Sequence, residues 1–117
     1  MLIKNKSLAS IKNPLNSFLF EKEFINVEQI FKKIVSQAED LPRTSIVKKD
    51  KYYWKGVCRS LIFRFPDDLE ILIKEINDKK TSKGIIQIRS ASRIGQSDLG
   101  VNQRRVHHLI NKVKEYY

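Results

Sequence analysis

The sequence has little of what would cross-link the chain or place it inside a membrane. Its 117 residues include a single cysteine, which excludes an intrachain disulfide framework and a zinc site built from several cysteines. No unbroken apolar run exceeds three residues, which excludes a transmembrane helix and the apolar region of a secretion signal. Four glycines and three prolines are too few for a disordered or fibrous chain. We therefore expect a soluble cytoplasmic domain, with peripheral membrane association as an open alternative.

Acidic side chains are also scarce, and the resulting charge limits the choice of partners. Lysine and arginine total 23 against 13 aspartates and glutamates, which gives a formal net charge of +10 at pH 7. A chain of this charge attracts nucleic acid, anionic lipid or an acidic protein surface. The lysines are spread along the whole chain, as on an ordinary solvated surface. Arginine is the sharper signal because it binds phosphate and carboxylate at two points, and one C-terminal window holds Arg89, Arg93, Arg104 and Arg105.

Apolar periodicity predicts a single α+β domain. Residues 27–41 place apolar side chains at helical spacing, with Asn26 as the expected N-cap of that helix. A second apolar stripe, ending at Tyr117, predicts a helix over 103–117. Between the helices, alternating and β-branched segments predict antiparallel strands at 44–49, 52–63, 69–74 and 86–89, with a turn at 66–68.

The expected architecture is a four-stranded antiparallel sheet with two helices packed on one face, in the order α-β-β-β-β-α. Residues 1–24 have no clear period, and we interpret them as a partly mobile N-terminal arm before a domain over 25–117. Aromatic side chains near the middle of the chain are expected to fill the core, with base stacking on an open sheet as the alternative: Tyr52, Tyr53, Trp54, Phe63 and Phe65.

The segment from Arg89 to Arg105 is unlike an ordinary connection between a strand and a helix. It is rich in arginine, hydroxyls, glycine, aspartate and asparagine, and it leads into a helix N-terminus, whose free N–H groups favour an anion. Its glycine spacing fits neither a P-loop nor a dinucleotide-binding loop. Our hypothesis is an anion site in which arginines clamp the ligand and serines donate hydrogen bonds: Arg89, Ser90, Ser92, Arg93, Ser97 and Arg105.

The alternative is that this segment closes on itself. Asp98 can pair with an arginine, and Asp98 or Asn102 can cap the last helix. Four arginines against one aspartate leave charge within the segment that internal pairing does not neutralise. Because an unpaired buried charge is costly, we expect the excess to face solvent or a ligand.

The same segment also resembles the signature of a known family. It matches the pattern of the family called domain of unknown function 1499, found in bacteria, cyanobacteria and plant and algal plastids, in the run RSASRIGQSDLGVNQRR. The run FPDDLE, from Phe65 to Glu70, is similar to a charged turn of that family. The resemblance covers about residues 25–117 and implies no activity. We expect structural roles for the polar and glycine residues of the two runs: Asp67, Asp68, Glu70, Gly95, Asp98, Gly100 and Asn102.

Other candidate sites are weaker. His107 and His108 are adjacent, so on a helix they point about 100° apart, whereas two ligands of one metal need the spacing of a full helical turn. Cys58 is expected to be buried and inert. The acids of the run 67–70 suit a charged hairpin turn better than a cation site. We therefore expect no metal and no cofactor.

Three classes of function stay open. The favoured one is a non-catalytic module that binds an anion, a phosphorylated small molecule or an acidic protein surface through its arginine and serine loop. The first alternative is a binder of nucleic acid or anionic membrane driven by the net charge. The second is an enzyme with an unrecognised site, since Ser97, Asp98 and His108 include the residue types of a hydrolase triad but lack a nucleophile elbow.

Overall fold

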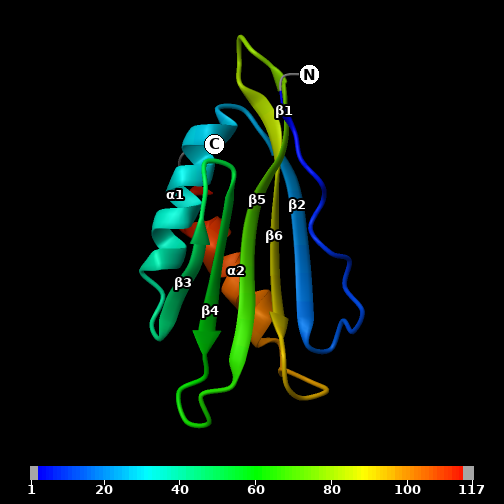
Figure 1. Cartoon of the computed structure of the whole chain (residues 1–117), viewed down its shortest axis with the longest axis vertical. Helices are drawn as coiled ribbons and strands as arrows, with labels where there is room; N and C mark the ends of the chain where they lie inside the picture. The colour runs from blue at the N-terminus through cyan, green and yellow to red at the C-terminus, as the bar shows by residue number, and fades with distance from the viewer. Residues whose placement is uncertain (1–2, 115–117) are drawn as a thin grey trace.

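The computed structural model describes residues 3–114, which form an antiparallel sheet with two helices packed against it (Figure 1). The strands are β1 (Ile3–Lys4), β2 (Ser17–Phe24), β3 (Thr44–Lys49), β4 (Tyr53–Arg59), β5 (Pro66–Asp78) and β6 (Lys83–Ser92). The helices are α1 (Val27–Glu39) and α2 (Val101–Lys112). Neither helix in this part of the chain is long and apolar enough to cross a membrane. The predicted α+β class is confirmed.

The sheet has six strands, so the expected number of four is wrong. Its order is β2-β6-β5-β4-β3, and β1 pairs with β5 beside this path. The additional strands come from the segment that the sequence suggested was an arm, and β2 pairs with β6 from Ser17 opposite Ala91 to Phe24 opposite Gly84. Consecutive charged residues at 21–23 hide the alternation of β2 in the sequence, but backbone pairing with β6 does not depend on that alternation.

Several helix and strand boundaries differ from those predicted. The strand expected over 52–63 ends at Arg59, and Pro66–Asp68 begins β5 instead of forming a turn. Asn26 adopts a left-handed conformation, with φ of 56°, and makes no side-chain cap, so the predicted capping is wrong. The last helix begins at Val101, earlier than expected, and Tyr117 lies outside the described residues.

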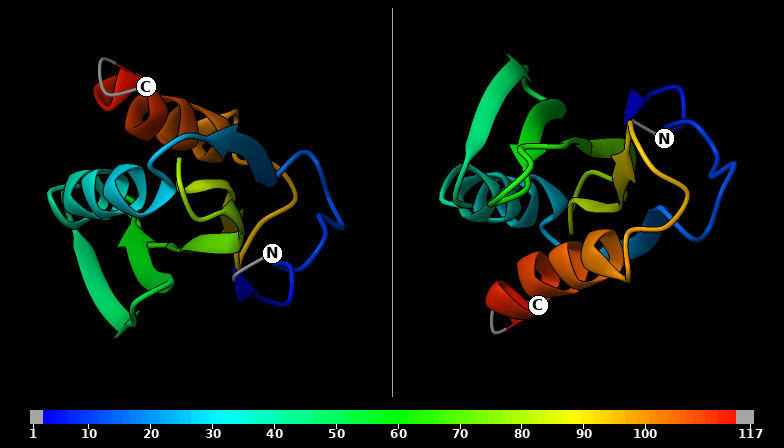
Figure 2. Two further views of the ribbon diagram at one scale, coloured as in Figure 1. Left: turned by 90° about the horizontal axis from the view of Figure 1, so that it is seen from above. Right: turned by 90° about the horizontal axis from the view of Figure 1, so that it is seen from below.

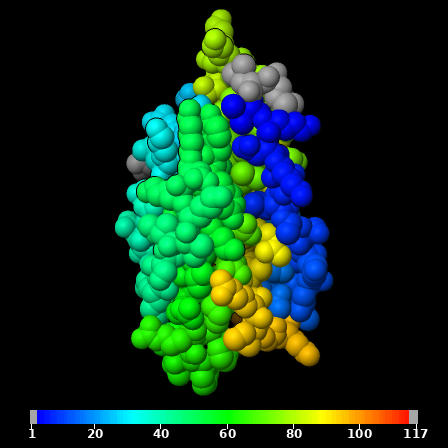
Figure 3. Space-filling model, in the orientation of Figure 1, coloured from blue at the N-terminus to red at the C-terminus, as the bar shows by residue number. Residues whose placement is uncertain are grey.

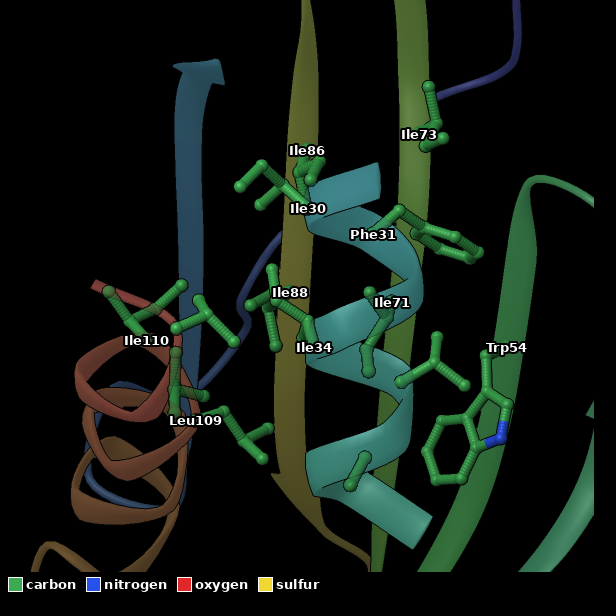
Figure 4. Packing of buried hydrophobic residues seen from close by; sticks show 14 of the residues in the cluster. Ile30, Phe31, Ile34, Trp54, Ile71, Ile73, Ile86, Ile88, Leu109 and Ile110 are labelled. Carbon is green, nitrogen blue, oxygen red and sulfur yellow. The ribbon is translucent and has the colours of Figure 1, made fainter. Parts of the chain in front are cut away.

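The core lies between the helices and the sheet. Views along the long axis show α1 and α2 on the concave side of the curved sheet (Figure 2), where α1 contacts β5 and β6 and α2 contacts β6 and β2. Buried side chains from both helices and from β2, β4, β5 and β6 form one cluster (Figure 4), which includes Ile30, Ile34, Trp54, Ile71, Ile88 and Leu109. This packing fixes the start of α2 against the ends of β5 and β6, where the signature segment lies.

Candidate functional site

Polar residues of the signature segment meet in one buried network where α2 begins. We call it the Asn102 network; its members are Asp67, Ser90, Ser92, Asp98, Asn102 and Arg105. Asn102 is fully buried, and its amide nitrogen donates to Asp98 Oδ2 at 2.6 Å and to Ser92 Oγ at 2.9 Å. Its amide oxygen accepts from Ser90 Oγ at 2.6 Å and from Arg105 Nη1 at 2.8 Å. The side chain of Asn102 therefore joins α2 to β6.

Arg105 extends the network to β5. Its Nη1 lies 3.0 Å from Asp67 Oδ2 and donates to Ser90 Oγ at 3.0 Å. The side chains of Arg105 and Asp67 are 13% and 11% exposed, so this ion pair is largely withdrawn from water. A charge in that position needs its partner, because removing one member of a buried pair leaves the other uncompensated.

Asp98 closes the N-terminal turn of α2. Its carboxylate accepts from the Gly100 N–H at 2.7 Å and from the Asn102 N–H at 3.0 Å, which satisfies donors that a helix start leaves free. Gly100 has a φ of 83°, a conformation that favours glycine, and a Cβ there would lie 2.9 Å from Arg104 Nη1. The Asp98 N–H donates to the Leu15 carbonyl at 2.9 Å, so the segment before β2 is held to the same turn.

Acidification is expected to weaken this end of the fold through Asp98. Burial alone would raise the pKa of Asp98, but hydrogen bonds from Asn102 and Gly100 outweigh it and hold that pKa below its usual value. A carboxyl of this kind stabilises the fold above its unfolded pKa of about 4 and loses that contribution as the pH falls through the folded pKa. We expect the free energy of unfolding in urea to fall between about pH 5 and pH 2, and Asp98→Asn to flatten part of that slope. An Asp98→Asn variant with the wild-type slope would contradict this assignment.

Two of the predicted anion ligands lie on the other face of the sheet. Alternation along β6 turns Arg89 and Arg93 away from Ser90 and Ser92. Arg93 forms a two-point ion pair with Asp68, at 2.9 Å from Nε to Oδ2 and 2.6 Å from Nη2 to Oδ1. These hydrogen bonds hold the pKa of Asp68 below its usual value. Arg93 thus has an internal acid partner, although its side chain stays 46% exposed.

Arg89 is also paired, but more loosely. It lies opposite Glu70 in the β5–β6 ladder, with 3.8 Å between Nη1 and Oε1. Tyr53 donates to the other oxygen of Glu70 at 2.6 Å, and burial followed by this hydrogen bond raises the pKa of Tyr53 well above its usual value. The buried Nε of Arg89 has no hydrogen-bond partner among the described residues.

The six predicted anion ligands therefore do not converge on one point. Ser90, Ser92 and Arg105 share the Asn102 network, while Arg89 and Arg93 lie on the opposite face. Ser97 is on the exposed loop, where its Oγ accepts from the Leu99 N–H at 3.4 Å. Gly95 has a φ of 91° in the same loop, and its carbonyl accepts from Asn16.

A second arrangement brings arginines together that the sequence places far apart. A cavity of about 290 Å³ opens between the end of α1, the adjoining ends of β3 and β4, and the start of α2. We call it the arginine pocket; its lining comprises Leu41, Pro42, Arg43, Thr44, Cys58, Arg59, Val101, Arg104, Arg105 and His108. No aspartate or glutamate is among these residues. The arginines are therefore the charged residues of the lining, and Arg105 among them pairs with an acid, Asp67, that lies outside the lining.

Three of the four guanidinium groups at this pocket each make a single hydrogen bond to the described residues. Arg43 donates Nε to the Arg59 carbonyl at 3.1 Å, and Arg104 donates Nη1 to the Leu99 carbonyl at 2.9 Å. Arg59 donates Nη1 to the Arg64 carbonyl at 3.2 Å. Each contact uses one of the five N–H donors of a guanidinium group, and it orients that group without neutralising its charge. All three side chains are exposed to solvent.

Sequence reasoning missed half of this pocket. Arg104 and Arg105 belong to the signature segment, but Arg43 and Arg59 flank β3 and β4 and carry no local motif. The predicted burial of Cys58 is confirmed: its side chain is 3% exposed and accepts a hydrogen bond from Thr44 Oγ1 at 3.3 Å. No group of three histidine, cysteine, aspartate or glutamate side chains suitable for a metal occurs in residues 3–114.

Comparison with known proteins adds a family but no activity. No curated protein shows significant similarity to the chain. A family model described as "Protein of unknown function (DUF1499)" matches residues 13–113, which include β2, the Asn102 network and the whole of α2. This match covers most of the 117 residues and confirms the resemblance carried by the two sequence runs. The chain therefore belongs to the DUF1499 family.

Proposed function

We propose that this domain is a non-catalytic binding module that holds a small phosphate- or carboxylate-bearing anion in the arginine pocket. The observation that carries the proposal is the convergence of four arginines on a cavity with no acidic lining residue. At about 290 Å³ the cavity is at the small end of ligand pockets, which suits a compact anion rather than an extended chain.

Electrostatics support an anion as the occupant. Arg43, Arg59 and Arg104 are exposed, and each donates a hydrogen bond to a backbone carbonyl of the described residues, which leaves its charge in place. Their like charges repel one another across the cavity. A bound phosphate relieves that repulsion and accepts the free N–H donors at charge-assisted distances. By contrast, Arg89 and Arg93 face acids on β5, which already occupy the positions an anion would take.

The signature segment has a supporting part in this proposal. The Asn102 network pins the first turn of α2, and that turn presents Arg104 and Arg105 to the pocket. The ion pair with Asp67 holds Arg105 in place at one side of the pocket, while the guanidinium group of Arg104 faces solvent. The segment is thus a frame that orients arginines, and the ligand lies beside it.

The first test is protection against heat by inorganic phosphate. At a phosphate concentration of about 100 times Kd, binding adds about 2.7 kcal/mol to the stability of the wild-type domain and raises its melting temperature. We expect Arg59→Gln and Arg104→Gln to keep the melting temperature of the unliganded protein and to lose most of this protection. The measurement is thermal melting in phosphate and in chloride at equal ionic strength.

The matched control is Lys80→Gln, which removes one exposed positive charge in the turn between β5 and β6. This variant is expected to keep the full protection. Equal loss in Lys80→Gln and Arg104→Gln would show a general charge effect and contradict the pocket. Thermal protection by duplex DNA would favour nucleic acid as the ligand instead, if that protection falls steeply with salt and is unchanged by the substitutions.

A further inference from the structure

One end of the molecule exposes an unusual amount of apolar surface. Figure 1 places the loop after β4 and the loop after β6 at the same end of the long axis, and Figure 3 shows them side by side. The Arg93 N–H donates to the Pro66 carbonyl at 3.1 Å, which joins the two loops at their base. We call this end the apolar tip; its residues are Leu61, Ile62, Phe63, Phe65, Ile94, Leu99 and Val101.

The exposure of the tip is large for side chains of this kind. Leu61, Ile62 and Phe63 are consecutive and are 69%, 78% and 71% exposed, and Leu99 in the neighbouring loop is 84% exposed. The rings of Phe63 and Phe65 stack at 5.4 Å on the surface, whereas the sequence had suggested that both belong to the core. Phe65 from the first loop and Ile94, Leu99 and Val101 from the second line one shallow hollow, and exposed apolar surface gathered in this way marks an interaction site.

Positive charge surrounds the tip. Arg59 and Arg64 flank the apolar residues of the first loop, and Arg104 follows those of the second. Asp67 and Asp68 are neutralised by Arg105 and Arg93, and the Asp98 carboxylate accepts hydrogen bonds from Gly100 and Asn102. The excess positive charge near the tip therefore comes from Arg59, Arg64 and Arg104. Apolar side chains at the centre and arginines around them match an anionic lipid surface, in which acyl chains lie beneath phosphate groups.

We propose that the apolar tip inserts into the interface of an anionic lipid bilayer. The loop residues Leu61, Ile62 and Phe63 enter the acyl boundary while the surrounding arginines meet the lipid phosphates. The shape of the molecule favours a bilayer over a second copy of the chain. The Cα trace measures 47 × 27 × 23 Å, and the tip occupies its narrow end. A stable dimer buries about 800 Å² on each partner. A dimer formed through this end would also bring the arginines of the two tips against each other.

This inference goes beyond the phosphate pocket and does not depend on it. The two share Arg59, Arg104 and Val101, so the variants that test the tip are made at residues outside the pocket. Phe63→Ser leaves every residue of the arginine pocket in place. An experiment can therefore contradict the phosphate pocket without contradicting the bilayer proposal, and the reverse.

The experiment is co-sedimentation of the full chain with lipid vesicles. We expect binding to vesicles of phosphatidylcholine mixed with phosphatidylglycerol and much weaker binding to phosphatidylcholine alone. Phe63→Ser is expected to lower the partition coefficient about ten-fold, which is the effect of withdrawing one large apolar side chain from the bilayer. Arg64→Gln is expected to lower it about five-fold, since one arginine near an anionic surface contributes a modest attraction.

The matched controls lie at the opposite end of the molecule. Ile25→Ser changes an isoleucine that is 59% exposed beside the start of α1, and Lys80→Gln removes a charge in the β5–β6 turn. Both variants are expected to bind vesicles as the wild type does, and equal melting temperatures establish that every variant is folded. Absence of binding to mixed vesicles, or equal losses in Ile25→Ser and Phe63→Ser, would overturn the proposal. Self-association in solution that Phe63→Ser abolishes would overturn it too, by assigning the tip to a second copy.

Discussion

Replacing Asp67 with alanine is expected to lower the free energy of unfolding by about 3–5 kcal/mol. The Asp67 carboxylate compensates Arg105 at 3.0 Å in a position where both side chains are nearly withdrawn from water. Alanine leaves the Arg105 charge buried beside the hydroxyl of Ser90 and the amide of Asn102, which do not neutralise it. Urea unfolding monitored by circular dichroism measures the change.

Asp68→Ala is the matched control, since it removes the neighbouring aspartate of the same strand. Its partner Arg93 is 46% exposed, and an ion pair that water reaches contributes about 0–1 kcal/mol. A double variant, Asp67→Ala with Arg105→Met, is expected to recover part of the loss because no buried charge remains. Similar losses for Asp67→Ala and Asp68→Ala would contradict the burial argument.

Leu109→Ala is expected to destabilise the domain by about 2–5 kcal/mol. Leu109 is fully buried, and it packs from α2 into the cluster that also holds Ile34 and Ile88 (Figure 4). Alanine removes apolar contacts and leaves a cavity that the rigid sheet fills poorly. The midpoint of urea unfolding measures the change, provided that the dependence of the unfolding free energy on urea concentration is the same in both proteins.

Leu99→Ala makes the same chemical change ten residues earlier, on a side chain that is 84% exposed. We expect an effect within about 0.5 kcal/mol, as for other surface substitutions. If the two leucine variants lost equal stability, the placement of α2 against the sheet would be wrong.

Local patterns were enough to predict the helices and the central strands. The apolar stripe of α1 recurs every three or four residues, and Val27, Ile30 and Ile34 are all buried as that spacing requires. Trp54 and Cys58 were each predicted to be buried, and both belong to the core, on the same face of β4 by its alternation. Such patterns are predictive because the spacing of apolar residues depends on which face of a helix or strand is buried.

Elements whose place depends on distant partners were not predictable in this way. β2 owes its position to pairing with β6, some seventy residues later, and its charged middle gives no alternation signal. The run 61–63 has the composition of a buried strand, yet it stands exposed in a loop. Apolar content alone predicts burial, and it fails where a surface serves an interaction.

The candidate site shows the same division. Counting charges within the signature segment set four arginines against one acid, but β5 supplies Asp67, Asp68 and Glu70 across the ladder. These tertiary pairs account for three of the arginines and leave Arg104. Arg43 and Arg59 reach the same cavity only through the fold of the chain, which no local spacing encodes.

The most direct measurement of the proposed function follows the arginine side chains themselves. Nuclear magnetic resonance of the arginine Nε–Hε groups, recorded during titration with phosphate at constant ionic strength, reports which guanidinium groups meet the anion. We predict saturable shifts for Arg43, Arg59 and Arg104, which line the pocket, and little change for Arg93, which is paired with Asp68. Shifts confined to Arg89 and Arg93, or unsaturable shifts of equal size in all seven arginines, would contradict the arginine pocket as the binding site.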